Sequence, residues 1–275
     1  MTGRFEPVRR VGRTRWRQGM AAPGERAIPE EVAVAFTYNR FAYAVMMASP
    51  ADLEDFAVGF SLSEGVVAGR DEIRDIEIVE SELGIELRLW ITEERIAAFT
   101  EHRRYVAGPT GCGLCGVESL AQAMRPPRRV AGGFRAAASE LAAAIAALPA
   151  RQRFNRETHA VHAAAFWEPG RGIVALREDV GRHNALDKLA GALARGGGAA
   201  ARGAVLLTSR VSVEMVQKTA ALGAPIIAAV SAPTALALRT AEEAGITLVA
   251  VAREDGFEIF THRERIALEE TEHVA

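Results

Sequence analysis

The chain has 275 residues, of which 49% are hydrophobic and 25% are charged, and its formal net charge is −2. These values are typical of a soluble protein with one large domain or two small ones, and they give no global indication of a nucleic-acid partner. Two cysteines are too few for a disulfide framework and suit a reducing compartment. No apolar run reaches the ~18 residues of a membrane helix, and the N-terminus lacks the apolar core of a signal peptide. We therefore expect a cytoplasmic protein that contacts neither membrane nor nucleic acid.

Residues 1–27 form a polar, arginine-rich segment in which Glu6 is the only acid before Pro23. A basic arm can bind nucleic acid or an acidic partner. Terminal segments of this composition are more often partly disordered. We expect a partly disordered basic arm here.

Residues 28–107 predict a small α+β domain. Alternating apolar residues over 31–48, with a turn at Asn39, indicate a β-hairpin, and a second pair of strands is expected over 73–79 and 85–91. Between the two pairs, Ser49 and Pro50 are typical of a helix start, and Gly65 is typical of a helix end. A further predicted helix begins at Thr92 and runs to about residue 104.

Both cysteines, Cys112 and Cys115, lie in the glycine-rich run 108–116, which leads into a predicted short helix over 117–124. Glycine leaves the thiols unscreened, and a helix N-terminus lowers the pKa of a nearby cysteine because it favours the thiolate. Buried core cysteines fit poorly in a run with four glycines in nine positions. The spacing leaves three possibilities open: half of a zinc site, a dithiol switch, and a thiol that carries or attacks a group.

Residues 108–275 predict an α/β domain that begins with the cysteine loop. An alanine-rich helix is expected over 137–148, and two strands over 162–166 and 172–177. The polar run 179–188 passes from a loop into a helix that ends at three glycines. From residue 204, strands over 204–207, 226–230 and 246–251 alternate with helices over 212–222 and 233–244, and a last short strand covers 257–261. This alternation predicts a parallel sheet with right-handed crossovers.

Polar residues follow the predicted parallel strands at their carboxyl ends, where open α/β sheets bind ligands. These residues are Ser209 and Arg210, then Ser231, then the run from Arg253 to Gly256. Arginine and helix N-termini both bind phosphate well, so the sequence predicts a phosphate-bearing ligand at this edge. The serines could instead simply cap helices. Neither a Gly-x-Gly-x-x-Gly nor a Gly-x4-Gly-Lys-[Ser/Thr] motif accompanies them.

The combination of these motifs resembles the FdhD family of formate dehydrogenase accessory sulfurtransferases. The matching segments lie within about residues 28–262 and are 110–116, 178–188, 208–210, 214–218, 230–234 and 247–249, with smaller agreements at 55–60 and 162–165. Each segment is weakly diagnostic alone, whereas their order and combination are specific.

The resemblance implies a sulfur carrier. A cysteine desulfurase would load a persulfide onto Cys112, with Cys115 assisting or relaying. The sulfur would then pass to a molybdenum (or tungsten) bis-guanine-dinucleotide cofactor, Mo-bis-MGD, before its insertion into formate dehydrogenase. A guanine nucleotide would mimic this bound acceptor, and no metal of the protein's own is expected. The resemblance also implies a homodimer and a cytidine-deaminase-like α/β/α fold, with a mixed, partly parallel sheet, for the C-terminal domain.

The family's cofactor-binding segment falls on Val251, Ala252, Arg253, Glu254, Asp255 and Gly256, and the strand-end argument also reached the last four of these. We assign Arg182 and His183 to shaping the pocket or stabilising the thiolate. The sequence departs from the family pattern at two places. The turn at Asn39 lacks the glycine that usually follows it, and Glu254 and Asp255 place two acids beside the site expected to bind an anionic ligand.

Two other functions compete with the sulfur carrier. A zinc-dependent deaminase-like hydrolase needs His-x-Glu before Pro-Cys-x-x-Cys, whereas here the cysteines come first and neither His159 nor His162 is followed by glutamate at that spacing. A non-enzymatic cofactor-binding chaperone would need the pocket but not the thiols.

Overall fold

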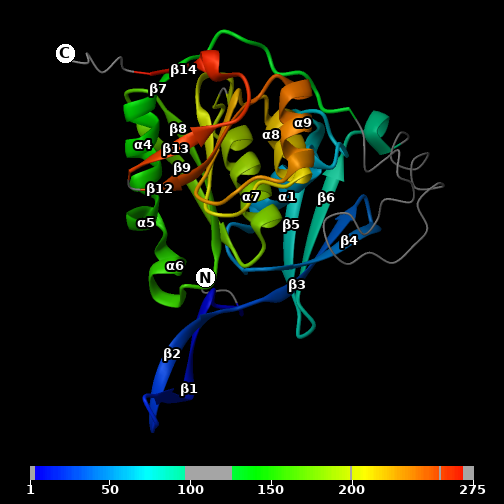
Figure 1. The fold of residues 1–275 in the computed structure, drawn as a ribbon. Helices are drawn as coiled ribbons and strands as arrows, with labels where there is room; N and C mark the ends of the chain where they lie inside the picture. Colours follow the sequence, from blue (N-terminus) through cyan, green and yellow to red (C-terminus); the bar gives the residue numbers. More distant parts are fainter. Residues whose placement is uncertain (1–3, 97–125, 199, 254, 269–275) are drawn as a thin grey trace.

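The computed structural model describes residues 4–96, 126–198, 200–253 and 255–268, and Figure 1 shows their arrangement. A protruding hairpin leads into a four-stranded sheet with one helix, and this unit packs against a six-stranded sheet flanked by helices. In the described part of the chain, every helix is too short or too polar to span a membrane.

The basic arm is a β-hairpin, so the expectation of partial disorder is wrong for residues 8–27. Strands β1 (Val8–Arg17) and β2 (Met20–Pro29) pair antiparallel. Gln18 and Gly19 both have positive φ, 50° and 82°, which matches the two-residue turn that suits the twist of a hairpin. The arginine-rich composition favoured a prediction of disorder, so this turn was not predicted. At its base the hairpin contacts the body, where Arg26 donates to the Thr158 carbonyl at 3.3 Å.

The four-stranded sheet has the order β4-β3-β6-β5 and confirms both predicted strand pairs. Its strands are β3 (Val32–Tyr38), β4 (Phe41–Ala48), β5 (Ile73–Glu80) and β6 (Ile85–Ile91). Helix α1 (Leu53–Ser63) covers one face, and the ring of Phe36 packs on Phe56 and Phe60 with centroids 5.0 and 4.1 Å apart. The helix starts at Leu53 instead of Pro50. Asp52, in a left-handed conformation (φ 52°), occupies its N-cap position, and Ser49 is used elsewhere.

The six-stranded sheet has the order β13-β12-β11-β10-β8-β9, and its central three strands are parallel, as predicted. The outer pairings β10–β8, β8–β9 and β12–β13 are antiparallel, so the sheet is mixed. The strands are β8 (His162–Glu168), β9 (Gly172–Asp179), β10 (Ala204–Leu207), β11 (Ile226–Ala229), β12 (Thr247–Arg253) and β13 (Gly256–Ile259).

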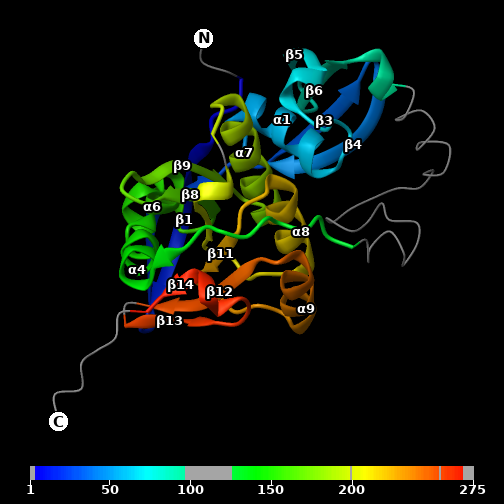
Figure 2. The same cartoon turned by 90° about the horizontal axis from the view of Figure 1, so that it is seen from above.

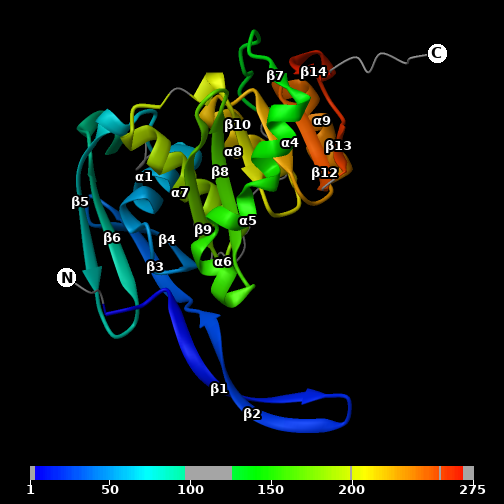
Figure 3. The ribbon, with the colours of Figure 1, turned by 90° about the vertical axis from the view of Figure 1, so that its left-hand side faces the viewer.

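Helices cover both faces of this sheet, which gives the predicted α/β/α layering (Figure 3). On one face lie α7 (Arg182–Arg195), α8 (Val213–Leu222) and α9 (Ala235–Ala244). On the other lies α4 (Ala138–Ala146), followed by α5 (Leu148–Arg151) and α6 (Arg153–Thr158). The alanine-rich helix, predicted over 137–148, ends at Ala146, and Pro149 stands in the first turn of the next helix, α5. A short parallel pair, β7 (Ala136–Ala137) and β14 (Ile266–Ala267), closes the fold.

The overall fold is mixed α/β, as expected. The cytidine-deaminase-like assignment stays a prediction. So does the domain boundary between residues 107 and 108, because it falls outside the described residues, as does most of the helix predicted after Thr92.

Helices α1 and α7 lie side by side between the two sheets (Figure 2). They approach each other closely at two glycines. A β-carbon added at Gly59 would lie 1.7 Å from the carbonyl oxygen of Asp187, and one added at Gly191 would lie 1.9 Å from that of Asp55. Only glycine allows the two backbones to lie this close, so this crossing fixes the position of one sheet relative to the other.

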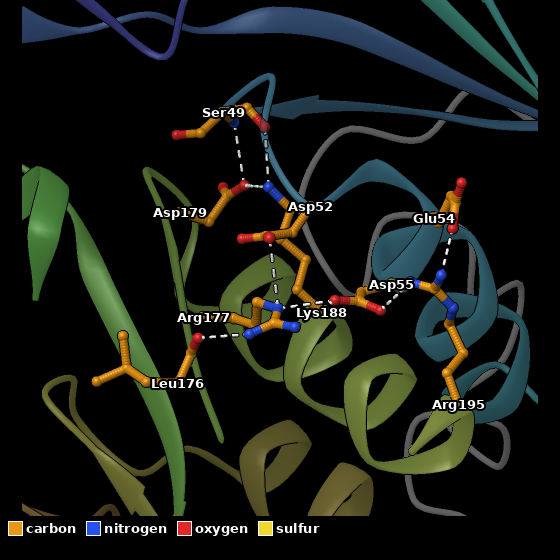
Figure 4. Close-up of polar contacts among 9 residues, drawn as sticks. All are labelled: Ser49, Asp52, Glu54, Asp55, Leu176, Arg177, Asp179, Lys188 and Arg195. Atoms are coloured by element: carbon orange, nitrogen blue, oxygen red, sulfur yellow. Dashed lines mark hydrogen bonds and ion pairs between the residues drawn. The ribbon is translucent and has the colours of Figure 1, made fainter. Parts of the chain in front are cut away.

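A buried ion pair lies at the end of the same joint (Figure 4). Lys188 Nζ and Asp179 Oδ2 are 2.6 Å apart, and both side chains are 0% exposed. Lys188 also donates to the Ser49 carbonyl at 2.8 Å, while Asp179 accepts from the Ser49 amide at 3.0 Å and from Asn184 at 3.0 Å. Ser49 therefore connects the end of β4 to the polar run 179–188 and does not cap α1.

Two further sets of ion pairs flank the joint. Asp55 of α1 accepts from Arg177 and Arg195, each at 2.6 Å (Figure 4). On the other side, Lys218 of α8 contacts Asp187 at 2.8 Å, and Ser63 donates to Asp187 at 2.6 Å. The contacts of Asp55 and Ser63 join α1 to the six-stranded sheet and its helices, whereas the Lys218–Asp187 pair joins α8 to α7.

Replacing Gly191 by alanine should destabilise the protein. Alanine normally favours a helix over glycine by about 1 kcal/mol, but here the new methyl group must push two backbones apart, which typically costs ~1–3 kcal/mol. Urea unfolding followed by circular dichroism measures the change. Gly24→Ala in the exposed arm is the matched control, because nothing lies within 4 Å of the added carbon. Equal or higher stability of Gly191→Ala would show that the helices can separate freely.

Replacing Lys188 by methionine should cost about 3–5 kcal/mol of unfolding free energy, because it leaves the buried Asp179 carboxylate without a counter-ion. Adding Asp179→Asn removes that charge, so the double variant should lose less than the sum of the two single variants. Chemical denaturation of the four proteins gives the coupling energy. Strict additivity would mean that the pair makes no net contribution.

Candidate functional site

The predicted catalytic residues, Cys112 and Cys115, lie outside the described residues, as does Glu254. The remaining residues of the candidate site are those predicted to contact a phosphorylated ligand. They can be placed one by one.

These residues lie along one edge of the six-stranded sheet. Ser209 and Arg210 follow β10, Ser231 follows β11, and Val251 lies near the end of β12. The start of β8 reaches the same edge, because Thr208 and Ala163 exchange hydrogen bonds of 3.1 and 2.8 Å. Neighbouring strands are about 4.8 Å apart, so the edge from β8 to β12 spans roughly 14 Å. The strand-end argument from sequence therefore placed the ligand-binding candidates on one continuous edge.

Three helices begin at this edge. The N-cap positions of α7, α8 and α9 are Gly181, Ser212 and Thr234, and the loops before α8 and α9 are tied together by a bond from the Thr234 amide to the Val211 carbonyl at 3.0 Å. The Thr234 side chain accepts a capping bond from Ala237, whereas the Ser212 side chain makes none. Ser231 is not at a cap position. Capping therefore does not explain the predicted serines, and the three N-termini together favour an anion.

The end of β12 is strained and is held against β11. Val251 has φ 53°, which is rare for a β-branched residue, and the β12–β13 register shifts between Ala250 and Arg253. The Val251 amide donates to the Ser231 carbonyl at 3.2 Å, and Arg253 donates to the carbonyls of Val230 and Ala252. The structure thus brings this segment beside Ser231, with one Arg253 nitrogen bonded to backbone. Strain of this kind is common at ligand sites.

The rest of the predicted binding segment lies beyond that strained residue. Ala252 is buried, Asp255 is exposed, and Gly256 begins β13 with φ 149°. Arg210 is exposed beside the buried Ser209, whose hydroxyl donates to the Arg210 carbonyl at 3.0 Å.

A second group of polar residues lies where α7 and α8 begin. Arg182 and His183 form the first turn of α7, and Glu214 belongs to the first turn of α8. Within the described part of the chain, Arg182 Nε, His183 Nε2 and Glu214 Oε2 are all buried and have no hydrogen-bond partner. Each buried polar atom left without a partner costs about 1–3 kcal/mol. Unpaired buried atoms of this kind suggest that a hydrogen-bonding ligand occupies the site. A ligand with both acceptor and donor atoms would provide partners for them.

The charges of this group are set by burial. Burial lowers the pKa of His183 to about 4, helped by the positive charges of Arg182 and Lys218, so its imidazole is neutral near pH 7. Burial and Arg182 also lower the pKa of His162. Burial alone would raise the pKa of Glu214, but hydrogen bonds at the start of α8 and the charge of Arg182 lower it overall. The site therefore combines one fixed cation, one carboxylate and two neutral imidazoles.

Two residues of this group, His162 and Glu214, were not among the predicted site residues. His162 starts β8 opposite Asp179. In the sequence it was considered only with His159, as a histidine that lacks the glutamate a zinc hydrolase needs. His159 instead ends α6 and is exposed. The signal for Glu214 was its place in the first turn of a helix that begins at the carboxyl end of a strand.

The described residues contain no cluster of three or more histidine, cysteine, aspartate or glutamate side chains that could hold a metal ion. A cavity of about 850 Å³ opens beside the outer strand β9, with Asp52, Arg153 and Ile173 among its lining residues. It includes none of the predicted site residues.

Comparison with known proteins gives matches over most of the chain. Residues 29–267 match the sequence model of the FdhD/NarQ family. A protein of Agrobacterium fabrum named Sulfur carrier protein FdhD is 56% identical over 94% of this chain and 96% of its own length. A protein of the same name from Cupriavidus necator is 51% identical over 92% of this chain and 88% of its own.

A solved structure shows the same fold. It is that of a candidate formate dehydrogenase accessory protein from Desulfotalea psychrophila, which is 26% identical and superposes with a TM-score of 0.74 over 95% of this chain and 100% of that one. From the family match and the two close relatives together, we conclude that the chain belongs to the FdhD/NarQ family.

Proposed function

We propose that this protein is a sulfur carrier in the maturation of formate dehydrogenase. The observation that carries the proposal is the 56% identity, over nearly the whole chain, to a relative named as a sulfur carrier. Acting as a sulfurtransferase in the cytoplasm, and as a homodimer, the protein takes sulfur from a cysteine desulfurase and delivers it to Mo-bis-MGD for the formate dehydrogenase apoprotein.

Loading is a thiol exchange at Cys112. The Cys112 thiolate attacks the outer sulfur of the desulfurase persulfide, a new sulfur–sulfur bond forms on Cys112, and the desulfurase cysteine leaves as a thiolate. No net oxidation occurs, because one persulfide replaces another. Two glycines flank Cys112 in the sequence, which supports an accessible thiol.

Release can use the second cysteine. If the Cys115 thiolate attacks the inner sulfur on Cys112, a Cys112–Cys115 disulfide forms, and the outer sulfur leaves at the level of sulfide with the electron pair of the broken bond. The two thiols then supply both electrons. A reductant must restore the dithiol before the next cycle.

The acceptor is a substrate with several phosphates and guanine rings, and the carboxyl edge has the chemistry to hold it. Three helix N-termini and the guanidinium groups of Arg182, Arg210 and Arg253 favour phosphate oxygens. The unpartnered atoms of Arg182, His183 and Glu214 offer both donor and acceptor capacity to its polar rings.

Loading should place one extra sulfur atom on the Cys112 peptide. The protein is incubated with a cysteine desulfurase and cysteine, and the peptides are then weighed by mass spectrometry. Cys112→Ala should abolish the mass increase, because its attacking thiolate is gone, whereas Cys115→Ala should keep it. Absence of added sulfur on the wild-type chain would contradict the proposal, as would loading that persists in Cys112→Ala.

Removing the Arg182 guanidinium should weaken binding of GDP, used as a probe of the acceptor, by about tenfold or more, because a charge-assisted hydrogen bond is worth ~1.5–3 kcal/mol. Isothermal titration calorimetry of Arg182→Gln measures this. Arg202→Gln is the matched control, since Arg202 is exposed and lies before β10, at the opposite edge of the sheet. Sulfur loading of Cys112 should be normal in both variants. Unchanged GDP affinity in Arg182→Gln would remove this residue from the site.

A further inference from the structure

The small net charge of the chain conceals two strongly charged hairpins. Residues 8–29, which form β1 and β2, contain six arginines and one glutamate, a net charge of +5. Residues 71–94, which include β5 and β6, contain nine acids and two arginines, a net charge of −7. The remaining residues sum to zero, since the total is −2. These two segments therefore account for the net charge of the whole chain. From here on, basic arm means residues 8–29, and acidic hairpin means residues 71–94.

Along its outer half, the basic arm makes no hydrogen bond or ion pair with any other described part of the chain. It projects away from both sheets, as Figures 1 and 3 show, and every residue from 14 to 26 is exposed. Trp16 and Met20 near its tip are 72% and 71% exposed. An isolated two-stranded hairpin is marginally stable in water, and exposed aromatic groups on a protruding element are typical of interfaces.

The arginines of the arm are ordered by the strand. Arg9, Arg13, Arg15 and Arg17 occupy alternate positions of β1, so they share one face, and Arg26 joins them from opposite Val11 on β2. Arg9 pairs with Glu30 at 3.1 Å and Arg13 donates to the Glu25 carbonyl at 3.2 Å. These bonds lie toward the base, and the described residues show no ion pair for Arg15 or Arg17 near the tip.

The acidic hairpin offers a matching surface. Among the described strands, β5 forms an outer edge of the four-stranded sheet, so one side of its backbone is unpaired. Asp75 and Glu77 are exposed at alternate positions of β5, and Leu83 in the turn is 92% exposed. Alternate residues of any strand repeat every ~6.8 Å, so the carboxylates of β5 have the same spacing as the arginines of β1.

A contact of this kind already exists within one chain. Just before the arm, the Arg4 amide donates to Glu80, and the Arg4 guanidinium pairs with Glu82 at 3.2 Å. The arm then leads away from the acidic hairpin, so its outer arginines cannot reach the acids of their own β5. A second copy carries the same surface without that constraint, and two such contacts related by a two-fold axis are identical.

We propose that the basic arm of one chain binds the acidic hairpin of a second copy, with Arg15 and Arg17 opposite Asp75 and Glu77 on the edge of β5. The inference rests on the homodimer in the proposed function and names its contacting surfaces. Strand pairing and the burial of Trp16 stabilise the contact, and complementary charge sets its register.

Charge reversal tests the pairing on full-length protein. Arg15→Glu/Arg17→Glu should convert the dimer to monomer in sedimentation velocity, and Asp75→Arg/Glu77→Arg should do the same. A mixture of these two variants should re-form a dimer, because each arm then meets an opposite charge. Raising salt from about 0.05 M to about 0.5 M should weaken the wild-type dimer. Arg239→Glu, an exposed change on α9, is the matched control and should leave the mass unchanged.

Several results would overturn the assignment. These are a monomeric wild-type chain, a dimer that survives both reversals, or a mixture that stays monomeric. So would tight binding of a labelled oligonucleotide by the wild type, lost in the arm variant, with no change of mass. Sulfur loading on Cys112 is measured in the same samples and should be normal in every variant. A failure of loading in the wild type would count against the sulfur-carrier function, and a failure of dimerisation against the arm alone.

Discussion

The buried pair of Lys188 and Asp179 is the constraint on which the rest of the structure depends. Two fully buried charges are tolerable only when each has a counter-ion and hydrogen bonds, and here Ser49 and Asn184 supply those bonds. The pair can therefore form in only one arrangement of the four-stranded sheet against α7. Because α7 begins immediately after β9, the same arrangement sets where the first turn of α7 stands at the carboxyl edge of the six-stranded sheet.

Residues of the polar run 179–188 have two different roles, which depend on the face of helix α7 that they occupy. Asn184, Asp187 and Lys188 share the face of α7 that meets the N-terminal unit, and each of their side chains has a partner there. Arg182 and His183 belong to the first turn, and a buried nitrogen of each lacks a partner. Within one segment, the joint is fully hydrogen-bonded and the edge is not. Since folded proteins rarely leave buried polar atoms unpaired, this contrast supports the proposal that a ligand binds at the edge.

Local pattern was sufficient for most of the secondary structure and for the location of the edge. Alternating apolar residues located β3–β6, and the strand–helix alternation after residue 204 gave the parallel centre of the sheet and hence Ser209, Ser231 and Val251 on one line. Local pattern was insufficient where the hydrogen-bond partner of a residue is distant in the sequence. Ser49 resembles a helix cap, yet its amide donates a hydrogen bond to the carboxylate of Asp179, 130 residues away. Glu214 and His162 lie near enough to Arg182 for its charge to lower their pKa values only because three strands bring them there, which no spacing along the chain reveals.

The basic arm illustrates a different limit of sequence-based prediction. Opposite charges that lie in separate segments cancel in the net charge of the whole chain. A net charge of −2 argues against any strongly charged surface, but the chain separates +5 and −7 into two hairpins. Neither hairpin contains a residue of the carboxyl edge, and both belong to the N-terminal side of the joint. Self-association through them would therefore leave the three helix N-termini and the unpartnered atoms of Arg182, His183 and Glu214 uncovered. The proposed carrier function, in which the protein meets a donor and an acceptor in turn, requires this separation, since a dimer contact at the edge would block the surface where we propose that the acceptor binds.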